Sequence, residues 1–377
     1  MKKPILILLI VCSAIFAQPQ CDIAPVKLGD IEISADKVFR NENGCVISIH
    51  FDTTRTYAKN CLDGVKQYSA TLETLSLELC RIPEIDLSPL SSCKNLRMLN
   101  LNGNLLTNID LSPLSTCKEF ESLLLTHNKL DSINLAPLTA CKKFLRLHMA
   151  FNNFTKIDLA PLMQCPALTW LHIGANKLTA IDLKPLASCK GLLALSIGEN
   201  LIDSIDLSPL AGCIKLKQLG LYRNKLTKIN LSPLVLCQSL EGIGLLENQL
   251  AEIDLSPLSK MENIKTLSLE FNRLKEIDLK PISGFTKIRE FSLAGNALTS
   301  LDLSPLAQWK GLKQLDFFNN RITSLDFSPI DGLDSLTTIR IHGNKLDAPT
   351  CEQICKIMDE RPKCFILADC VCPRKGK

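Results

Sequence analysis

Aromatic side chains are scarce in this 377-residue chain, at 5% of the residues, and neither sign of charge dominates. The 43 basic and 39 acidic residues leave a formal net charge of +4, which gives no electrostatic reason to expect binding to nucleic acid or to an anionic membrane. Histidine is also rare, with five residues scattered along the chain. The sequence has no nucleophile–base pair, phosphate-binding loop or strong metal-ligand spacing. It therefore argues against an enzyme, and we expect no cofactor and no metal.

Long apolar runs are missing as well, except at the N-terminus. Residues 1–17 have the pattern of a secretory signal peptide, because Lys2 and Lys3 precede the apolar stretch Ile5–Phe16 and the small residue Ala17 follows it. About a dozen apolar residues are short for a span of ~30 Å of hydrocarbon, so a membrane anchor is the weaker alternative. We expect an exported chain, in the periplasm, on the cell surface or secreted, with no transmembrane span in its mature form.

The most regular feature of the chain is asparagine, which recurs every 24 residues. A whole repeat reads LRMLNLNGNLLTNIDLSPLSTCKE over residues 96–119, and Cys80 takes the asparagine position one period earlier. The asparagines are Asn104, Asn128, Asn152, Asn176, Asn200, Asn224, Asn248, Asn272, Asn296, Asn320 and Asn344. A fixed period over twelve units predicts a stacked solenoid and not a single globular core. An asparagine amide donates and accepts, so a column of amides is expected to satisfy the backbone of the buried turns.

Each repeat divides into a strand and an outer turn. Leu99 and Leu101 alternate with polar residues, which is the period of a strand, so stacked repeats are expected to form one long parallel sheet. Ser112-Pro113 predicts a short helical turn, with serine as its N-cap and proline as its first residue. Asp110 of the IDL segment is expected to bond backbone N–H groups two residues on. A calcium-binding carboxylate ladder is the alternative for this column of aspartates.

Seven of the seventeen cysteines share the 24-residue period, at Cys93, Cys117, Cys141, Cys165, Cys189, Cys213 and Cys237. Later repeats place Met261, Phe285, Trp309 and Leu333 there, so we expect a buried apolar position and unreactive thiols. Other cysteines gather at the ends, at Cys21, Cys45, Cys61 and Cys80 and at Cys351, Cys355, Cys364, Cys370 and Cys372. In an exported chain these indicate disulfides in two caps. Zinc binding is the alternative at the C-terminal end.

The phrase LxxLxLxxNxLxxIDLSPLxxCxx resembles the leucine-rich repeat family, and above all its short-repeat, internalin-like members, over about 275 of the 377 residues. The resemblance implies an α/β solenoid, a curved horseshoe with a concave parallel β-sheet, short helical turns on the convex side and a cap at each end. We accordingly divide the chain into a signal peptide (1–17), a cysteine-containing cap (18–71), twelve repeats (72–346) and a cysteine-rich helical cap (347–377). The resemblance also implies a non-catalytic scaffold that binds a protein, less often a glycan.

In such a fold the strand residues that are not leucine face the concave side, in three columns. Arg146, His148, Trp170 and His172 gather on two adjacent repeats, and arginine, tryptophan and tyrosine are the usual anchors of interfaces. We expect Arg146 to be close enough to Trp170 to stack on it. Small residues beyond them, such as Gly174 and Gly198, are expected to form a flat floor. The candidate partner-binding residues are Arg146, His148, Trp170, His172, Tyr222, Phe151 and Phe318.

Three alternatives to a protein-binding patch stay open. The residues are ordinary solvent-facing side chains, or His148 and His172, ~5 Å apart on neighbouring strands, hold a metal. In the third alternative the chain is a structural or glycan-binding component of the cell envelope, in which Trp170 and Tyr222 stack on sugars.

Overall fold

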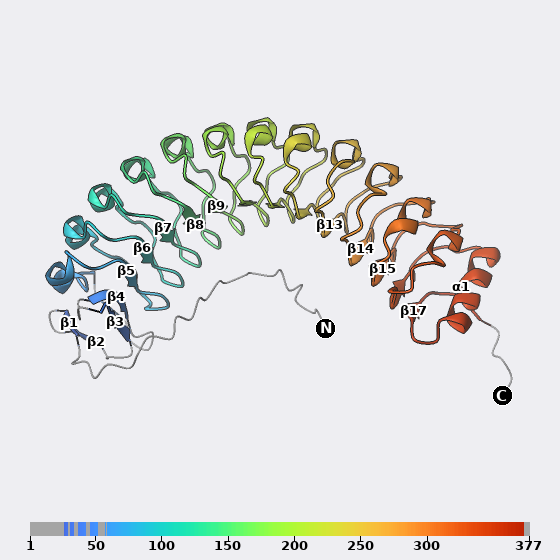
Figure 1. Ribbon diagram of the computed structural model, residues 1–377, viewed down its shortest axis with the longest axis horizontal. Helices are drawn as coiled ribbons and strands as arrows, with labels where there is room; N and C mark the ends of the chain where they lie inside the picture. Colours follow the sequence, from blue (N-terminus) through green and yellow to red (C-terminus); the bar gives the residue numbers. More distant parts are fainter. Residues whose placement is uncertain are drawn as a thin grey trace.

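The computed structural model describes residues 26–28, 31–33, 37–42, 46–51, 57 and 59–372. The predicted signal peptide and Cys21 and Cys45 lie outside the described residues. The chain forms an open arc with short strands along its inner side and short helical turns along its outer side (Figure 1). The predicted fold class, a curved leucine-rich-repeat solenoid, is confirmed.

One sheet of 15 strands lines the inner side, and its strands follow one another in chain order. All neighbours are parallel except β3 and β4, and equivalent residues of successive repeats face each other, as Arg146 and Trp170 do. The separate hairpin β1–β2 comprises Val26–Leu28 and Ile31–Ile33. The sheet consists of β3 (Val38–Arg40), β4 (Val46–His50), β5 (Thr74–Ser76), β6 (Met98–Asn100), β7 (Ser122–Leu124), β8 (Arg146–His148), β9 (Trp170–His172), β10 (Ala194–Ser196), β11 (Gln218–Gly220), β12 (Gly242–Gly244), β13 (Thr266–Ser268), β14 (Glu290–Ser292), β15 (Gln314–Asp316), β16 (Thr338–Arg340) and β17 (Phe365–Leu367).

The outer turns are 3-10 helices of three to six residues. They are η2 (Asp63–Tyr68), η3 (Ser88–Ser92), η4 (Ser112–Thr116), η5 (Ala136–Ala140), η6 (Ala160–Gln164), η7 (Lys184–Ser188), η8 (Ser208–Gly212), η9 (Ser232–Leu236), η10 (Ser256–Leu258), η11 (Lys280–Ile282), η12 (Ser304–Gln308) and η13 (Ser328–Ile330). Runs this short suit the tighter 3-10 geometry. From η3 to η13 a proline stands near the start of each turn, where the N–H that it lacks would be unpaired.

The start of these turns corrects one prediction and confirms another. The N-cap of η4 is Leu111, and Ser112 is already inside the turn, so serine is not the cap. Instead Ser112 donates its backbone N–H to the Asp110 carboxylate, at 2.9 Å, as predicted for the aspartate. Asn134 and Asn230 accept the same bond at 3.0 and 2.9 Å, so the position needs a side-chain oxygen and not a charge. This local hydrogen bond explains why aspartate or asparagine recurs at this position, and the explanation does not require calcium.

The asparagine column ties each repeat to its neighbours. Asn176 donates from Nδ2 to the carbonyl oxygens of Met149, Ile173 and Gly174, each at 3.1 Å, and its Oδ1 accepts from the N–H of Phe154 at 3.1 Å. The same pattern runs from Asn104 to Asn344. The predicted structural role is confirmed, because these amides satisfy backbone groups that water does not reach.

The periodic cysteines lie in the core, as predicted. All seven are buried free thiols, and burial raises the pKa of Cys141 to about 12 and of Cys165 to about 11. Trp309, which takes the same place in a later repeat, is fully buried and donates its indole N–H to the Ser283 carbonyl at 3.2 Å. The position is therefore part of the apolar core, whichever side chain occupies it.

The two ends of the arc are closed differently. At the N-terminal end β4 continues the sheet by pairing with β5, while Cys61, which we expected in a disulfide, is a buried free thiol. At the C-terminal end β17 completes the sheet, and two disulfides, Cys351–Cys370 and Cys355–Cys372, join α1 (Ala348–Glu360) to the segment that follows β17. Cys364 is a free thiol, as expected because the C-terminal cap has an odd number of cysteines. Among the described residues, no helix is long and apolar enough to cross a membrane.

Candidate binding face

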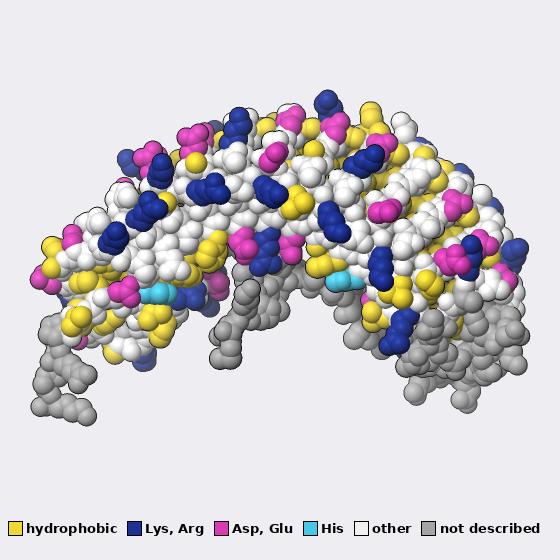
Figure 2. Space-filling model, turned by 180° about the vertical axis from the view of Figure 1, so that it is seen from behind, with side chains coloured by type: hydrophobic (Ala, Val, Ile, Leu, Met, Phe, Trp, Pro, Cys, Tyr) yellow, Lys and Arg dark blue, Asp and Glu magenta, His cyan; other side chains and the backbone are white. Residues whose placement is uncertain are grey.

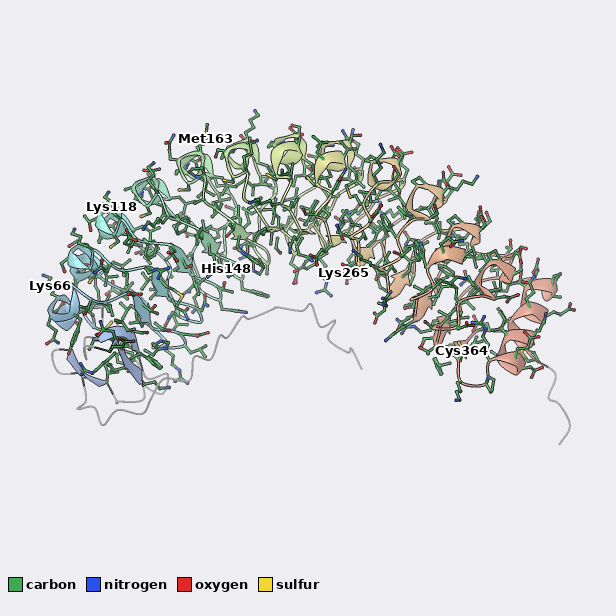
Figure 3. All side chains as sticks on the ribbon, viewed as in Figure 1. Lys66, Lys118, His148, Met163, Lys265 and Cys364 are labelled. Atoms are coloured by element: carbon green, nitrogen blue, oxygen red, sulfur yellow. A yellow bond between two sulfur atoms is a disulfide. The ribbon has the colours of Figure 1, made fainter. Side chains whose placement is uncertain are left out.

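The concave face is built by alternation along each three-residue strand. The middle residue of a strand, such as Leu147 or Leu171, points into the core, so its two neighbours point to the inner side of the arc. Figure 3 shows His148 on this inner side and Lys118 and Met163 on the outer side. We call the group Arg146, His148, Trp170 and His172 the N-terminal patch, since β8 and β9 bring all four together.

The two histidines of the patch form its half-buried base. Their rings meet edge to face with centroids 5.9 Å apart. Burial lowers the pKa of His148 to about 4, with contributions from His172 and Arg146, and burial lowers the pKa of His172 as well. Both rings are therefore neutral at pH 7. Nε2 of His148 is buried and has no hydrogen-bond partner among the described residues.

Arg146 and Trp170 project further, and both are exposed. They face each other across β8 and β9, so the predicted proximity is confirmed, but no cation–π contact joins them in the structure. Among the described residues, the cation–π contact found lies between Arg340 and the ring of Phe318, at 5.5 Å. The indole of Trp170, 37% exposed, is left open for contact with a partner.

Tyr222 corrects the expectation of a bare floor beyond the patch. Its ring lies along the sheet, so that a methyl group built at Gly198 would come within 2.7 Å of it. The Tyr222 hydroxyl is hydrogen-bonded with Ser196, and burial raises its pKa. A methyl group at Gly174 would approach the His172 ring to 3.3 Å and the Gly198 carbonyl to 2.9 Å. The glycines thus make room for the face's own aromatic rings, which they hold close to the sheet.

A fourth column, formed by the residue immediately before each position of the asparagine column, was not predicted from the sequence. Its backbone is left-handed, with positive φ at Leu79, Gly103, His127, Phe151, Ala175, Glu199, Arg223, Glu247, Phe271, Gly295, Asn319 and Gly343. The left-handed backbone could have been predicted, because glycine and asparagine, the residues that favour it, recur at this position of the repeat. The candidate Phe151 belongs to this column, where its ring, 43% exposed, stacks on His127 with centroids 4.1 Å apart.

Charged residues of the same column form a ladder at the middle of the arc. Arg223 lies between two carboxylates, 3.1 Å from Glu247 and 3.8 Å from Glu199. Figure 2 shows side chains of opposite charge side by side at the middle of the inner edge.

Phe318 belongs to a second group, near the C-terminal end of the face. Its ring stacks on His342, with centroids 5.0 Å apart, and meets Phe271 edge to face at 6.3 Å. Asp316, which is buried, accepts from Nε of Arg340 at 2.7 Å. Six strands separate Trp170 on β9 from β15, a distance of roughly 29 Å along the sheet. The seven predicted residues therefore form one cluster of four on β8 and β9, with Phe151 on its rim, Tyr222 two strands beyond and Phe318 apart.

Metal ligands do not come together on this face. Among the described residues no group of three or more histidine, cysteine, aspartate or glutamate side chains could hold a metal ion, and His148 and His172 have no third ligand beside them.

Two family descriptions match the chain. "Leucine rich repeat" matches residues 166–226 and 286–346, and "BspA type Leucine rich repeat region" matches residues 66–193. No curated protein matches the chain at a significant level. With the sheet, the asparagine column and these matches, the chain belongs to the leucine-rich repeat family.

Within the family, the chain is similar to internalins and to other bacterial members. A solved internalin of Listeria monocytogenes is 26% identical, with a TM-score of 0.69, and the match covers 87% of each chain. A leucine-rich repeat protein of Leptospira interrogans is 20% identical over 82% of this chain and 87% of that one, with a TM-score of 0.61. The functional domain of InlJ from Listeria monocytogenes, which includes a cysteine ladder, is 23% identical over 80% of this chain and 64% of that one, with a TM-score of 0.62.

Proposed function

We propose that this chain is an exported, non-catalytic recognition scaffold that binds a protein partner on its concave face through the N-terminal patch. One observation carries the proposal. Three buried side-chain atoms on the inner face, in His148, Glu270 and His342, have no hydrogen-bond partner among the described residues. Leaving such an atom unpaired costs about 1–3 kcal/mol, so each calls for an explanation, and a side chain that turns outward to bond a partner supplies one.

The neighbouring side chains have the composition of an interface. Arg146 and Trp170 are exposed anchors, and the rings of His172 and Tyr222 beside them are already held against the sheet. Side chains fixed before binding lose less conformational entropy when a partner arrives. Similar solved structures include the internalin and a plant peptide hormone receptor in complex with RGF2, which are recognition proteins of the same fold.

Export is supported by three features. Residues 1–17 have the pattern of a signal peptide. The C-terminal cap carries two disulfides, which persist in oxidising compartments. The internalin likeness and the BspA-type match agree with a place at the cell surface.

The test places a photo-crosslinking amino acid at Trp170 on the inner face and, in a matched control, at Met163 on the outer side, which is 55% exposed. The partner is supplied by intact cells of the organism from which the chain comes, or by material from the natural environment of that organism. We expect one protein to be captured from position 170 and not from position 163, and Arg146→Ala to reduce that capture at least tenfold without changing the circular dichroism spectrum. Equal capture at both positions, or capture indifferent to Arg146→Ala, would remove the patch as the binding site.

A glycan is the second candidate, since the exposed indole of Trp170 is a surface on which sugars stack. Binding of the wild-type chain to a glycan array that is lost in Trp170→Ala, without protein capture, would favour it.

A further inference from the structure

The two halves of the concave face differ in charge. From β10 to β16, the three strand columns and the left-handed column hold five carboxylates and two guanidinium groups. The carboxylates are Glu199, Glu247, Glu270, Glu290 and Asp316, and the guanidinium groups are Arg223 and Arg340. From β5 to β9 the same columns hold one carboxylate, Glu78, and one guanidinium group, Arg146. A partner that lies along the face therefore meets a net negative charge in the C-terminal half, whereas the one carboxylate and one guanidinium group of the N-terminal half balance.

Glu270 stands out among these carboxylates because it is half-buried and still no cation neutralises it, whereas Glu290, which also makes no ion pair among the described residues, is exposed to solvent. Arg223 serves Glu199 and Glu247, and Arg340 is bonded to Asp316. Among the described residues, no basic side chain makes an ion pair or a hydrogen bond with Glu270, and its Oε2 is buried without any hydrogen-bond partner.

Aromatic rings and two further carboxylates, Asp316 and Glu247, lie near Glu270. Glu270 directly precedes Phe271, whose ring is 44% exposed and meets the ring of Phe318 edge to face. The residue beside Glu270 on the next repeat is the small Ala294, which is fully buried, and the ring of Phe318 from the repeat after it reaches the ring of Phe271. Burial raises the pKa of Glu270 to about 7, and the charges of Asp316 and Glu247 add to the effect, while backbone hydrogen bonds oppose it.

A carboxylate beside aromatic faces is suited to a basic side chain. A lysine or arginine head gains from the carboxylate charge and from the ring faces together, and its aliphatic stem packs on the rings. Arg340 already shows this use of the cluster, with its guanidinium 5.5 Å from the centroid of Phe318.

We propose that Glu270, with Phe271 and Phe318, forms a subsite for a lysine or arginine side chain of an extended basic segment in the protein partner. This proposal rests on the proposed function, since it assigns a second contact on the same face. β9 and β13 are four strands apart, roughly 19 Å, so about six residues of extended chain separate the residue that contacts Trp170 from the basic residue at Glu270.

The experiment selects binders from a phage library of random 12-residue peptides on the immobilised full chain at pH 8. The variants are Glu270→Gln and Phe318→Ala. The matched control is Glu252→Gln, which removes the same charge from an exposed position outside the concave columns. We expect the selected peptides to be enriched in lysine and arginine. A resynthesised peptide should bind Glu270→Gln and Phe318→Ala at least tenfold more weakly than wild type, and Glu252→Gln as wild type.

Three results would overturn the proposal: no enrichment of basic residues, equal affinity for Glu270→Gln, or equal losses in Glu270→Gln and Glu252→Gln. Failure of the proposed function is distinguishable, because it appears as loss of specific crosslinking at position 170. Such a failure would leave a Glu270-dependent affinity for basic peptides intact. Circular dichroism of each variant verifies that a weak binder is folded.

Discussion

The ring of Tyr222 lies against Gly198, so close that a methyl group at Gly198 would meet three ring carbons at 2.7 to 2.8 Å. The glycine is required by its neighbour's ring and not by its own backbone, since it is not among the glycines with positive φ. Gly198 is therefore part of the binding face although it presents no side chain to a partner.

Gly198→Ala is predicted to displace the Tyr222 ring and weaken partner or peptide binding about tenfold while leaving the fold intact. Gly191→Ala is the matched control, because a methyl group there meets only ordinary contact, 3.9 Å from Thr169. Binding assays on both variants, with tyrosine fluorescence of the free chains, measure the effect. Equal binding by the two variants would show that the position of Tyr222 is unimportant.

Asn176→Ala is predicted to destabilise the solenoid by about 1–3 kcal/mol, because the buried Phe154 N–H loses its partner and three carbonyl groups each lose one of two donors. Urea denaturation followed by circular dichroism measures the loss. Asn153→Ala, at the neighbouring position of the preceding repeat but outside the column, should change stability by less than about 0.5 kcal/mol. Similar losses in both variants would contradict the special role of the column.

The thiols are predicted to differ in their reaction with iodoacetamide at pH 8 in the folded chain. Cys364 is half-buried, whereas Cys141 and Cys165 are fully buried with pKa values raised by burial to about 12 and about 11. Because the thiolate is the reactive form and must be reached by the reagent, Cys364 should be modified before Cys141 and Cys165. Mass spectrometry of digests at timed intervals gives the order. Early modification of Cys165 would mean that the repeats open readily.

Glu270 is predicted to make the chain less stable as the pH rises. Its pKa is raised from 4.5 to about 7, so between these values the folded chain keeps a proton that the unfolded chain has lost. Stability therefore falls over this range, by about 3 kcal/mol, and stays lower above pH 7. Glu247 and Asp316, with their partners Arg223 and Arg340, are the charged groups that surround it. Urea denaturation of Glu270→Gln should lack this component, and Glu252→Gln should retain it; matching pH profiles for all three chains would refute the prediction.

His148 is predicted to make the chain less stable as the pH falls, which is the opposite of the effect of Glu270. Its pKa is lowered from 6.5 to about 4, so as the pH falls through this range the unfolded chain binds a proton that the folded chain resists. Stability is full above pH 6.5 and falls by about 3 kcal/mol towards pH 4. His148→Leu should remove that loss, measured as the difference between its stability and that of wild type at pH 4.5 and pH 7.5. A constant difference would show that the ring takes up its proton normally.

The features of the fold that depend on the stacking of repeats could be predicted from the 24-residue period. Asn176 is paired in the structure as the sequence implied, because every repeat poses the same backbone requirement at the same place. The thiol of Cys165 and the indole of Trp309 could be assigned to one buried position by comparing repeats. The serine cap was mistaken, because the turn starts one residue earlier than predicted: Leu111 is the cap, and Ser112 donates its own N–H to the Asp110 carboxylate.

The candidate site was harder to predict because it depends on where side chains lie across repeats. The ring of Tyr222 covers Gly198 through its own rotamer, which no spacing in the sequence specifies. Arg146 and Trp170 are neighbours by register, yet their side chains do not stack. Glu270 lies among the concave residues that strand periodicity indicates, but its lack of a cation depends on the pairings that Arg223 and Arg340 make elsewhere.

Nine of the twelve left-handed positions before the asparagine column carry a side chain, among them Leu79, Phe151 and Phe271. A residue with a Cβ in this conformation costs roughly 1 kcal/mol relative to glycine. Replacement of such a residue by glycine is expected to raise thermal stability wherever its side chain makes no compensating contact. Protein engineers could use these positions as a stability reserve, offsetting the losses that accompany new specificities introduced elsewhere on the arc.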